Sequence, residues 1–213
     1  MSCKETWDVM SQWVDPNFFF SKTYGWHNMA IVGILGDYAL NFIKGDMLEI
    51  GIGESSIYMS ALAKKYKRKI YYCDSNADKV DDIKKSGYFA ENSEIHVCLS
   101  DDMFANNTFT PLAFSFIDGD HSYEGARKDF WNVEKYTVPN GLILLHDSYP
   151  LTEDCCGNGG NGEVYKLRQE LEQNKDFECF TFVGNKDSSI EPCYYISSTL
   201  VRKKPVNRPY YQE

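Results

Sequence analysis

The sequence predicts an α/β fold with a doubly wound, mostly parallel sheet of seven strands that ends in a C-terminal antiparallel hairpin. Short apolar runs alternate with helical patterns over residues 28–145, which is typical of parallel strands joined by crossover helices. Beyond this region the pattern changes to one helix followed by two longer β-type runs. Two such runs, separated by a short polar loop, can pair antiparallel.

The predicted parallel strands are too short for helices, and most are nearly continuous in apolar residues, as strands buried on both faces should be. These strands are residues 47–50, 70–73, 95–99, 113–117 and 142–145. The two hairpin strands are residues 178–183 and 193–201. The sheet is therefore expected to contain five parallel strands and the terminal hairpin.

Helical patterns surround the predicted strands. They cover residues 28–43, 54–66, 77–85, 123–136 and 163–173. In the fourth pattern, Ala126, Phe130 and Val133 fall at positions i, i+4 and i+7, so one face of this helix is expected to be buried.

One domain, residues 1–213, is expected because the chain is long enough for one core and contains no candidate linker. Residues 1–45 form its predicted N-terminal region, a helical cap rich in aromatic side chains. These side chains are expected either to fold over the site or to pack between helices. A Gly- and Asn-rich loop at 157–162 is expected to act either as a lid or as a plain connector.

Composition and charge exclude several classes of protein. A formal net charge of -9 argues against nucleic acid as a partner, because phosphate binding needs clustered Lys and Arg. No apolar run approaches the roughly 20 residues that a membrane span needs. The N-terminus is polar and the seven cysteines are scattered without a C-x-x-C pair, so we expect a cytoplasmic protein. Monomer and homo-oligomer both stay open.

A candidate cofactor site follows the first strand, where Glu49, Gly51 and Gly53 form the pattern E-x-G-x-G before a helix. Glycines let the backbone turn sharply and approach a ligand closely. A carboxylate at Glu49 would repel a pyrophosphate but would suit a ligand with an ammonium group. Asp74 ends the next strand, where a carboxylate can accept both hydroxyls of a ribose.

This pattern resembles the first motif of class I S-adenosylmethionine (SAM)-dependent methyltransferases, which have a Rossmann-like fold. The resemblance implies SAM as cofactor, bound by Glu49, Gly51, Gly53 and Asp74, with Ser55 in place of the usual third glycine. After the third strand, Ser100-Asp101-Asp102 resembles the adenine-edge position of the family. Asp101, or alternatively Asp102, is expected to accept from the adenine amino group, although a loop aspartate can equally cap the local backbone.

Acids and histidines concentrate at the ends of the fourth and fifth strands. The segment 116–125 reads FIDGDHSYEG, and the segment 139–147 reads PNGLILLHD. Asp118 ends the fourth strand, with Asp120 and His121 close behind, and His146 and Asp147 end the fifth strand. The carboxyl ends of parallel strands share one edge of a sheet, so we expect these side chains beside Glu49 and Asp74, with Asp118 bordering the cofactor.

The two segments resemble a methyltransferase subgroup that includes macrolide-sugar O-methyltransferases and cephalosporin-hydroxylase-like proteins. The resemblance implies methyl transfer to a small molecule, such as a sugar or natural-product hydroxyl; N-methylation stays open. In related metal-dependent O-methyltransferases, acids at these two strand ends hold a divalent ion. Matched by position, Asp118 and Asp147, with His146 or Ser148, would hold a metal, with Mg²⁺ the first candidate.

Catalysis would then need a base, because a hydroxyl is a poor nucleophile at neutral pH. His121 or His146, with Asp120 nearby, is expected to take the proton. An unmetallated site, with Asp118 and His146 hydrogen-bonded to backbone, is the alternative.

Two other functions compete with a methyltransferase. A nicotinamide-dependent oxidoreductase would share the Gly turn and Asp74, but it should carry G-x-G-x-x-G, and the sixth position here is Ser56. A non-catalytic SAM-binding protein would need Glu49 and Asp74 but nothing at His121 or Asp147. The cluster of acids and histidines therefore favours the enzyme.

Overall fold

The computed structural model describes residues 30–150, 162–186 and 195–205. Its strands are β1 (Asp46–Ile50), β2 (Ile70–Asp74), β3 (Ser93–Val97), β4 (Leu112–Ile117), β5 (Thr137–His146), β6 (Phe177–Lys186) and β7 (Tyr195–Lys203). Its helices are α3 (Ala30–Phe42), α4 (Ser55–Tyr66), α5 (Ala77–Ser86), α6 (Ser100–Asn106), α7 (Tyr123–Glu134) and α8 (Val164–Gln173). The predicted lid segment lies outside the described residues except for Gly162, and so do residues 1–29 of the predicted cap.

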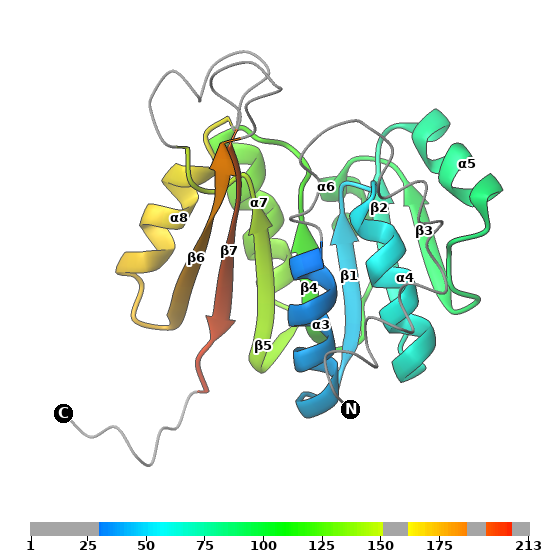
Figure 1. Ribbon diagram of the computed structural model, residues 1–213, viewed down its shortest axis with the longest axis horizontal. Helices are drawn as coiled ribbons and strands as arrows, with labels where there is room; N and C mark the ends of the chain where they lie inside the picture. The colour runs from blue at the N-terminus through cyan, green and yellow to red at the C-terminus, as the bar shows by residue number, and fades with distance from the viewer. Residues whose placement is uncertain (1–29, 151–161, 187–194, 206–213) are drawn as a thin grey trace.

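Within the described residues, the strands form one sheet of seven in the order β3-β2-β1-β4-β5-β7-β6 (Figure 1). The first five strands are parallel to one another. Strand β7 is antiparallel to both β5 and β6, so it inserts between them. The predicted fold class, a doubly wound and mostly parallel sheet with an antiparallel C-terminal pair, is confirmed.

Each face of the sheet carries a hydrophobic core and a layer of helices (Figure 1). The core on one face includes Leu40 of α3, Leu62 of α4 and Val80 of α5. The core on the other face includes Met103 of α6, Phe130 of α7 and Leu167 of α8. Successive residues of a strand point to opposite faces, which is why the central strands β1, β2 and β4 are mostly apolar along their length. No helix of the described segments is long and apolar enough to cross a membrane.

Several elements differ from the sequence prediction: β6 extends to Lys186 rather than 183, β7 ends at Lys203 rather than 201, and α6, β5 and β3 differ for identifiable reasons. Helix α6 was expected as a loop, because only Met103 of its short stretch is buried and an apolar period is therefore missing. Strand β5 begins at Thr137 rather than at 142, and its added residues 139–140 are exposed and include a proline, which resembles a turn. Strand β3 lies two residues earlier than predicted, because its side chains are mostly half-buried.

The ends of β1 and β4 approach each other so closely that only glycine fits at position 51. Gly51 has a φ of +86°, and a Cβ placed there would lie 1.9 Å from the backbone oxygen of Asp118. The Asp118 amide in turn donates to the Ile50 carbonyl at 2.8 Å. By contrast, a Cβ on Gly53 would meet nothing within 4 Å among the described residues.

We therefore expect Gly51→Ala to lower the free energy of unfolding by roughly 2–4 kcal/mol, from backbone strain and overpacking together. Gly53→Ala should stay within about 0.5 kcal/mol of the unsubstituted protein. Urea unfolding of the two variants measures this difference, and equal losses would contradict the close approach at Gly51.

Candidate cofactor pocket and carboxylate–histidine cluster

A pocket of about 380 Å³ opens at the carboxyl ends of β1, β2 and β4. Its walls come from the turn at Gly51, from the end of β2 at Asp74 and the following residues as far as Lys79, and from residues 98–100 after β3. Asp118 and the residues that follow it close the remaining side. This is the switch point of the sheet, where the strand order reverses from β1 to β4 and where such folds bind ligands.

The Glu49 carboxylate is fully buried next to this pocket. Ser55, at the start of α4, donates its hydroxyl to Oε1, whereas Oε2 is buried and has no hydrogen-bond partner in the described part of the chain. Burial, and to a smaller extent the charge of Asp118, raises the pKa of Glu49 from 4.5 to about 8. A buried acceptor without a donor is costly, so this position suits a ligand that brings one.

Asp74 lines the pocket and also fixes its shape. One carboxylate oxygen accepts from the Ile52 amide at 2.9 Å, and the other accepts from the Asn76 amide at 2.8 Å. The Lys79 ammonium lies 3.2 Å from the first oxygen. Asp74 thus ties the Gly51–Gly53 turn to the end of β2, at the wall where a ribose would lie.

The predicted adenine-edge acids lie elsewhere. Asp101 and Asp102 are exposed in the first turn of α6, and neither is among the described residues that line the pocket. The Asp101 carboxylate lies 3.2 Å from Lys128 and 3.4 Å from Asn132, both on the surface of α7. In this structure, Asp101 therefore faces a neighbouring helix rather than the pocket.

The ends of β4 and β5 bring together two acids and two histidines. His121 Nε2 lies 3.1 Å from Asp118 Oδ1, and His121 Nδ1 lies 3.7 Å from Asp147 Oδ2. Among the described residues, Asp118, His121 and Asp147 offer ligand atoms that all lie within 4.8 Å of one another. The structure thus offers His121, rather than His146, as the third residue of a candidate metal-ligand group with the two acids.

His146 lies deeper, between the same two carboxylates. Its Nδ1 is 3.0 Å from Asp118 Oδ1 and 3.4 Å from Asp147 Oδ1, and its side chain is 4% exposed. Its Nε2 is buried without a partner in the described segments, and the ring packs edge-on against Phe116. Ser148, the other candidate third ligand, bonds instead to Thr199 of β7 at 2.7 Å.

Their neighbours stabilise the charged forms of Asp118, His121 and His146. Burial alone would raise the pKa of Asp118, but His146 and His121 outweigh it and hold that pKa well below its usual range. The hydrogen bond to Asp118 raises the pKa of His121. Burial would lower the pKa of His146, yet Asp118 and Asp147 raise it well above its usual range. Asp147 also has a φ of +49°, an uncommon backbone conformation of the kind found at functional sites.

Asp120, predicted as a catalytic residue, accepts from the Ser122 amide at 2.8 Å in front of α7, and its side chain is exposed. It lines the pocket but is not part of the carboxylate–histidine cluster. Sequence reasoning missed Asp129, which is 2% exposed and lines the same pocket from α7. The signal was present, because Asp129 interrupts the apolar face made by Ala126, Phe130 and Val133.

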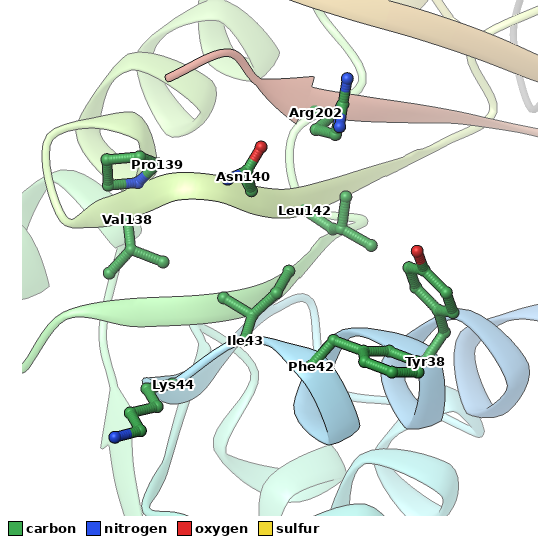
Figure 2. Close-up of a pocket in the computed structure, with 9 residues that line it drawn as sticks. All are labelled: Tyr38, Phe42, Ile43, Lys44, Val138, Pro139, Asn140, Leu142 and Arg202. Carbon is green, nitrogen blue, oxygen red and sulfur yellow. The ribbon is translucent and has the colours of Figure 1, made fainter. Parts of the chain in front are cut away.

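A second hollow of about 430 Å³ lies at the opposite edge of the sheet, where β5 begins and α3 ends. Figure 2 shows Tyr38 and Phe42 of α3 on one side and Leu142 of β5 on the other. Lys44 and Arg202 add positive charge, and no acid is among the described residues that line it. Although it is the larger of the two, it contains none of the predicted site residues.

Residues 48–148 match a protein family described as a methyltransferase domain. The fold resembles the O-methyltransferase of Bacillus cereus in complex with SAH, with a TM-score of 0.64, 14% identity, and coverage of 94% of this chain and 90% of that one. TomG of Streptomyces achromogenes, an O-methyltransferase involved in tomaymycin synthesis and solved with SAM, has a TM-score of 0.65, 14% identity, and coverage of 93% and 90%.

The N-methyltransferase NodS of Bradyrhizobium japonicum WM9 also shares the fold, with a TM-score of 0.57, 12% identity, and coverage of 84% of this chain and 96% of that one. At these identities the likeness of the solved structures shows the fold alone. The fold is therefore common to enzymes that methylate different atoms.

The different burial of the two histidines generates a stability prediction. His146→Gln should lower the free energy of unfolding by about 3 kcal/mol, because it leaves buried carboxylates without their cationic partner. His121→Gln should lower the free energy of unfolding by less than about 1 kcal/mol, because the His121 side chain is 32% exposed. Urea unfolding at pH 7.5 compares the two variants; a larger loss for His121→Gln would show that the roles are reversed.

Proposed function

We propose that the chain is a SAM-dependent methyltransferase, with its methyltransferase domain at residues 48–148, and that it transfers the methyl group of SAM to a hydroxyl of a small molecule. The observation that supports SAM as the donor most directly is the buried Oε2 of Glu49, which has no partner in the described structure. A ligand with a positively charged amino-acid tail supplies the missing donor and the missing charge. The solved O-methyltransferases of the same fold hold SAH or SAM.

The described lining of the pocket, which does not include Glu49, supports the same donor. Asp74, Asp118, Asp120 and Asp129 all contribute to the walls, so the pocket is rich in acceptors and negative charge. The adenosyl group offers hydroxyl and amino donors, and the sulfonium is positive. A dinucleotide would place its negatively charged pyrophosphate among these acids, which argues against a nicotinamide-dependent enzyme.

When bound, SAM supplies a methyl group on a positively charged sulfur, which makes transfer to oxygen favourable. The protein must then align the acceptor and remove its proton. We assign proton removal to the neutral form of His121, because its side chain is 32% exposed whereas that of His146 is 4% exposed. His146 holds Asp118 and Asp147 in place, at 3.0 and 3.4 Å from its Nδ1.

A divalent cation also fits the cluster. Two carboxylates and an imidazole, from Asp118, Asp147 and His121, form a ligand set that suits Mg²⁺ or Mn²⁺. Such an ion would lower the pKa of an acceptor hydroxyl, which is the same task that His121 performs as a base. The chemistry therefore favours O-methylation with or without the metal, and ion titration distinguishes the two arrangements.

Glu49 gives the sharpest test of the donor. With a pKa of about 8, the carboxyl is mostly protonated in the free protein below that pH, and it must lose its proton to bind a cationic tail. Affinity for SAH should therefore rise between pH 6 and 8, by up to about tenfold per pH unit, and level off above pH 8. Glu49→Gln should lower the affinity at pH 8 by roughly 10–100-fold and flatten the pH profile.

Isothermal titration with SAH between pH 6 and 9 measures both effects. Asp102→Asn, an exposed carboxylate outside the described pocket lining, is the matched control and should keep the normal profile. Full-strength SAH binding by Glu49→Gln would remove the support for the proposed donor site. Binding of NAD without binding of SAH would overturn the methyltransferase function itself.

The metal can be tested without a known acceptor. If the cluster binds Mg²⁺ or Mn²⁺, a hundredfold excess over Kd should stabilise the fold by about 2.7 kcal/mol and raise the unfolding temperature. Asp147→Asn should remove this shift, and Glu94→Gln, which removes the acid of the surface pair with His96 at 3.1 Å, should keep it. An unchanged unfolding temperature of the unsubstituted protein would leave His121 alone to remove the proton.

A further inference from the structure

We propose that Asp129 recognises the 6-amino group of the donor's adenine and makes the enzyme specific for adenosyl over inosyl cofactors. The proposal rests on SAM as the proposed donor and assigns one part of its site. The carboxylate comes from α7 and lies beside the turn at Gly119, whereas the sequence placed this role in the segment after β3.

The position of Asp129 is the first argument. Its side chain lines the pocket from α7 and lies directly beside Ser100 at the start of α6. Asp129 is 2% exposed, so the protein interior holds its carboxylate in one place. A buried acid on the apolar face of a helix adds nothing to packing, and its cost has to be offset by hydrogen bonds.

The orientation of the carboxylate is the second argument. Oδ1 accepts from the hydroxyl of Ser100, which anchors the group to the start of α6. Oδ2 lies 2.9 Å from the point that a Cβ on Gly119 would occupy. A side chain at position 119 would crowd this oxygen, so glycine lets the turn after β4 lie against the carboxylate. Oδ2 is the oxygen that we assign to the amino group.

The neighbouring side chains suit a flat base. Leu99 also lines the pocket, and it is 63% exposed. Its side chain can cover one face of a purine while Asp129 contacts an edge. Asp74 lies at another wall, beside the amide of Ile52, so ribose and base would be held by different carboxylates.

The charge of Asp129 decides which base it accepts. Burial, and to a smaller extent the charges of Asp101 and Asp120, raises the pKa of Asp129 to about 6. The group is therefore mainly ionised at pH 7.5 and can only accept hydrogen bonds. The 6-amino group of adenine donates, whereas the 6-carbonyl oxygen of hypoxanthine accepts and would face the carboxylate with no donor between them.

Asp101 is the competing candidate, and it provides a matched control. It stands next to Ser100 in the sequence, but its carboxylate is exposed and pairs with Lys128 at 3.2 Å. If Asp101 recognised the base, it would have to leave this partner and turn toward the pocket. Substitution of either acid by asparagine changes one oxygen to an NH₂ group, so the two variants differ in position alone.

The experiment is isothermal titration, at pH 7.5, of three proteins with SAH and with S-inosylhomocysteine. The unsubstituted protein should prefer SAH by at least about tenfold. Asp129→Asn should lose roughly tenfold or more in SAH affinity, and its preference for SAH should shrink or reverse, because an amide can donate to the 6-carbonyl. Asp101→Asn should keep the normal preference, and thermal unfolding checks that each variant is folded.

Several outcomes would overturn the proposal. They are equal binding of both ligands by the unsubstituted protein, an unchanged preference in Asp129→Asn, or a lost preference in Asp101→Asn. The first of these needs no variant, so the proposal stays testable even if Asp129→Asn does not fold. Failure of the unsubstituted protein to bind either ligand would instead overturn SAM as the donor, and the role of Asp129 with it.

Discussion

The close approach of β1 and β4 at Gly51 is the constraint on which the rest of the site depends. The Asp118 amide bonds to the Ile50 carbonyl at 2.8 Å, and the glycine at 51 leaves room for the Asp118 oxygen. This contact brings the proposed donor site next to the carboxylate–histidine cluster, because Glu49 lies two residues before the glycine and the cluster begins at Asp118. A side chain at position 51 would push the proposed donor site away from the proposed catalytic residues.

The surroundings of Glu49 and Asp118 shift the pKa values of these two carboxyl groups in opposite directions. Burial raises the pKa of Glu49 to about 8, although the group accepts a hydroxyl hydrogen bond, and it must lose a proton before it binds a cation. Asp118 lies against two histidines, which hold its pKa low. Two carboxylates on neighbouring strand ends are thus set to opposite protonation states by what surrounds them. Such a pair is typical of a site that binds a charged ligand and moves a proton.

Sequence reasoning worked where a single local pattern carries the information. The continuous apolar runs identified the parallel strands, and the E-x-G-x-G turn identified the switch point, because both depend on residues close in the chain. It was weaker where burial is partial. Helix α6 buries only Met103, so its sequence has no apolar period that separates it from a loop. The start of β5 is exposed at 139–140 and includes a proline, so those residues resemble a turn.

The sequence by itself determined the fold class, the edge of the sheet that holds the site, and the residue types that gather there. Parallel strands end at a common edge, and this rule needs no coordinates. Only the tertiary structure decided which side chains face one another there. It put His121 with Asp118 and Asp147, buried His146 behind them, turned Asp101 toward Lys128, and brought Asp129 to the pocket. These choices depend on contacts between residues far apart in the chain, which spacing along one strand or helix does not encode.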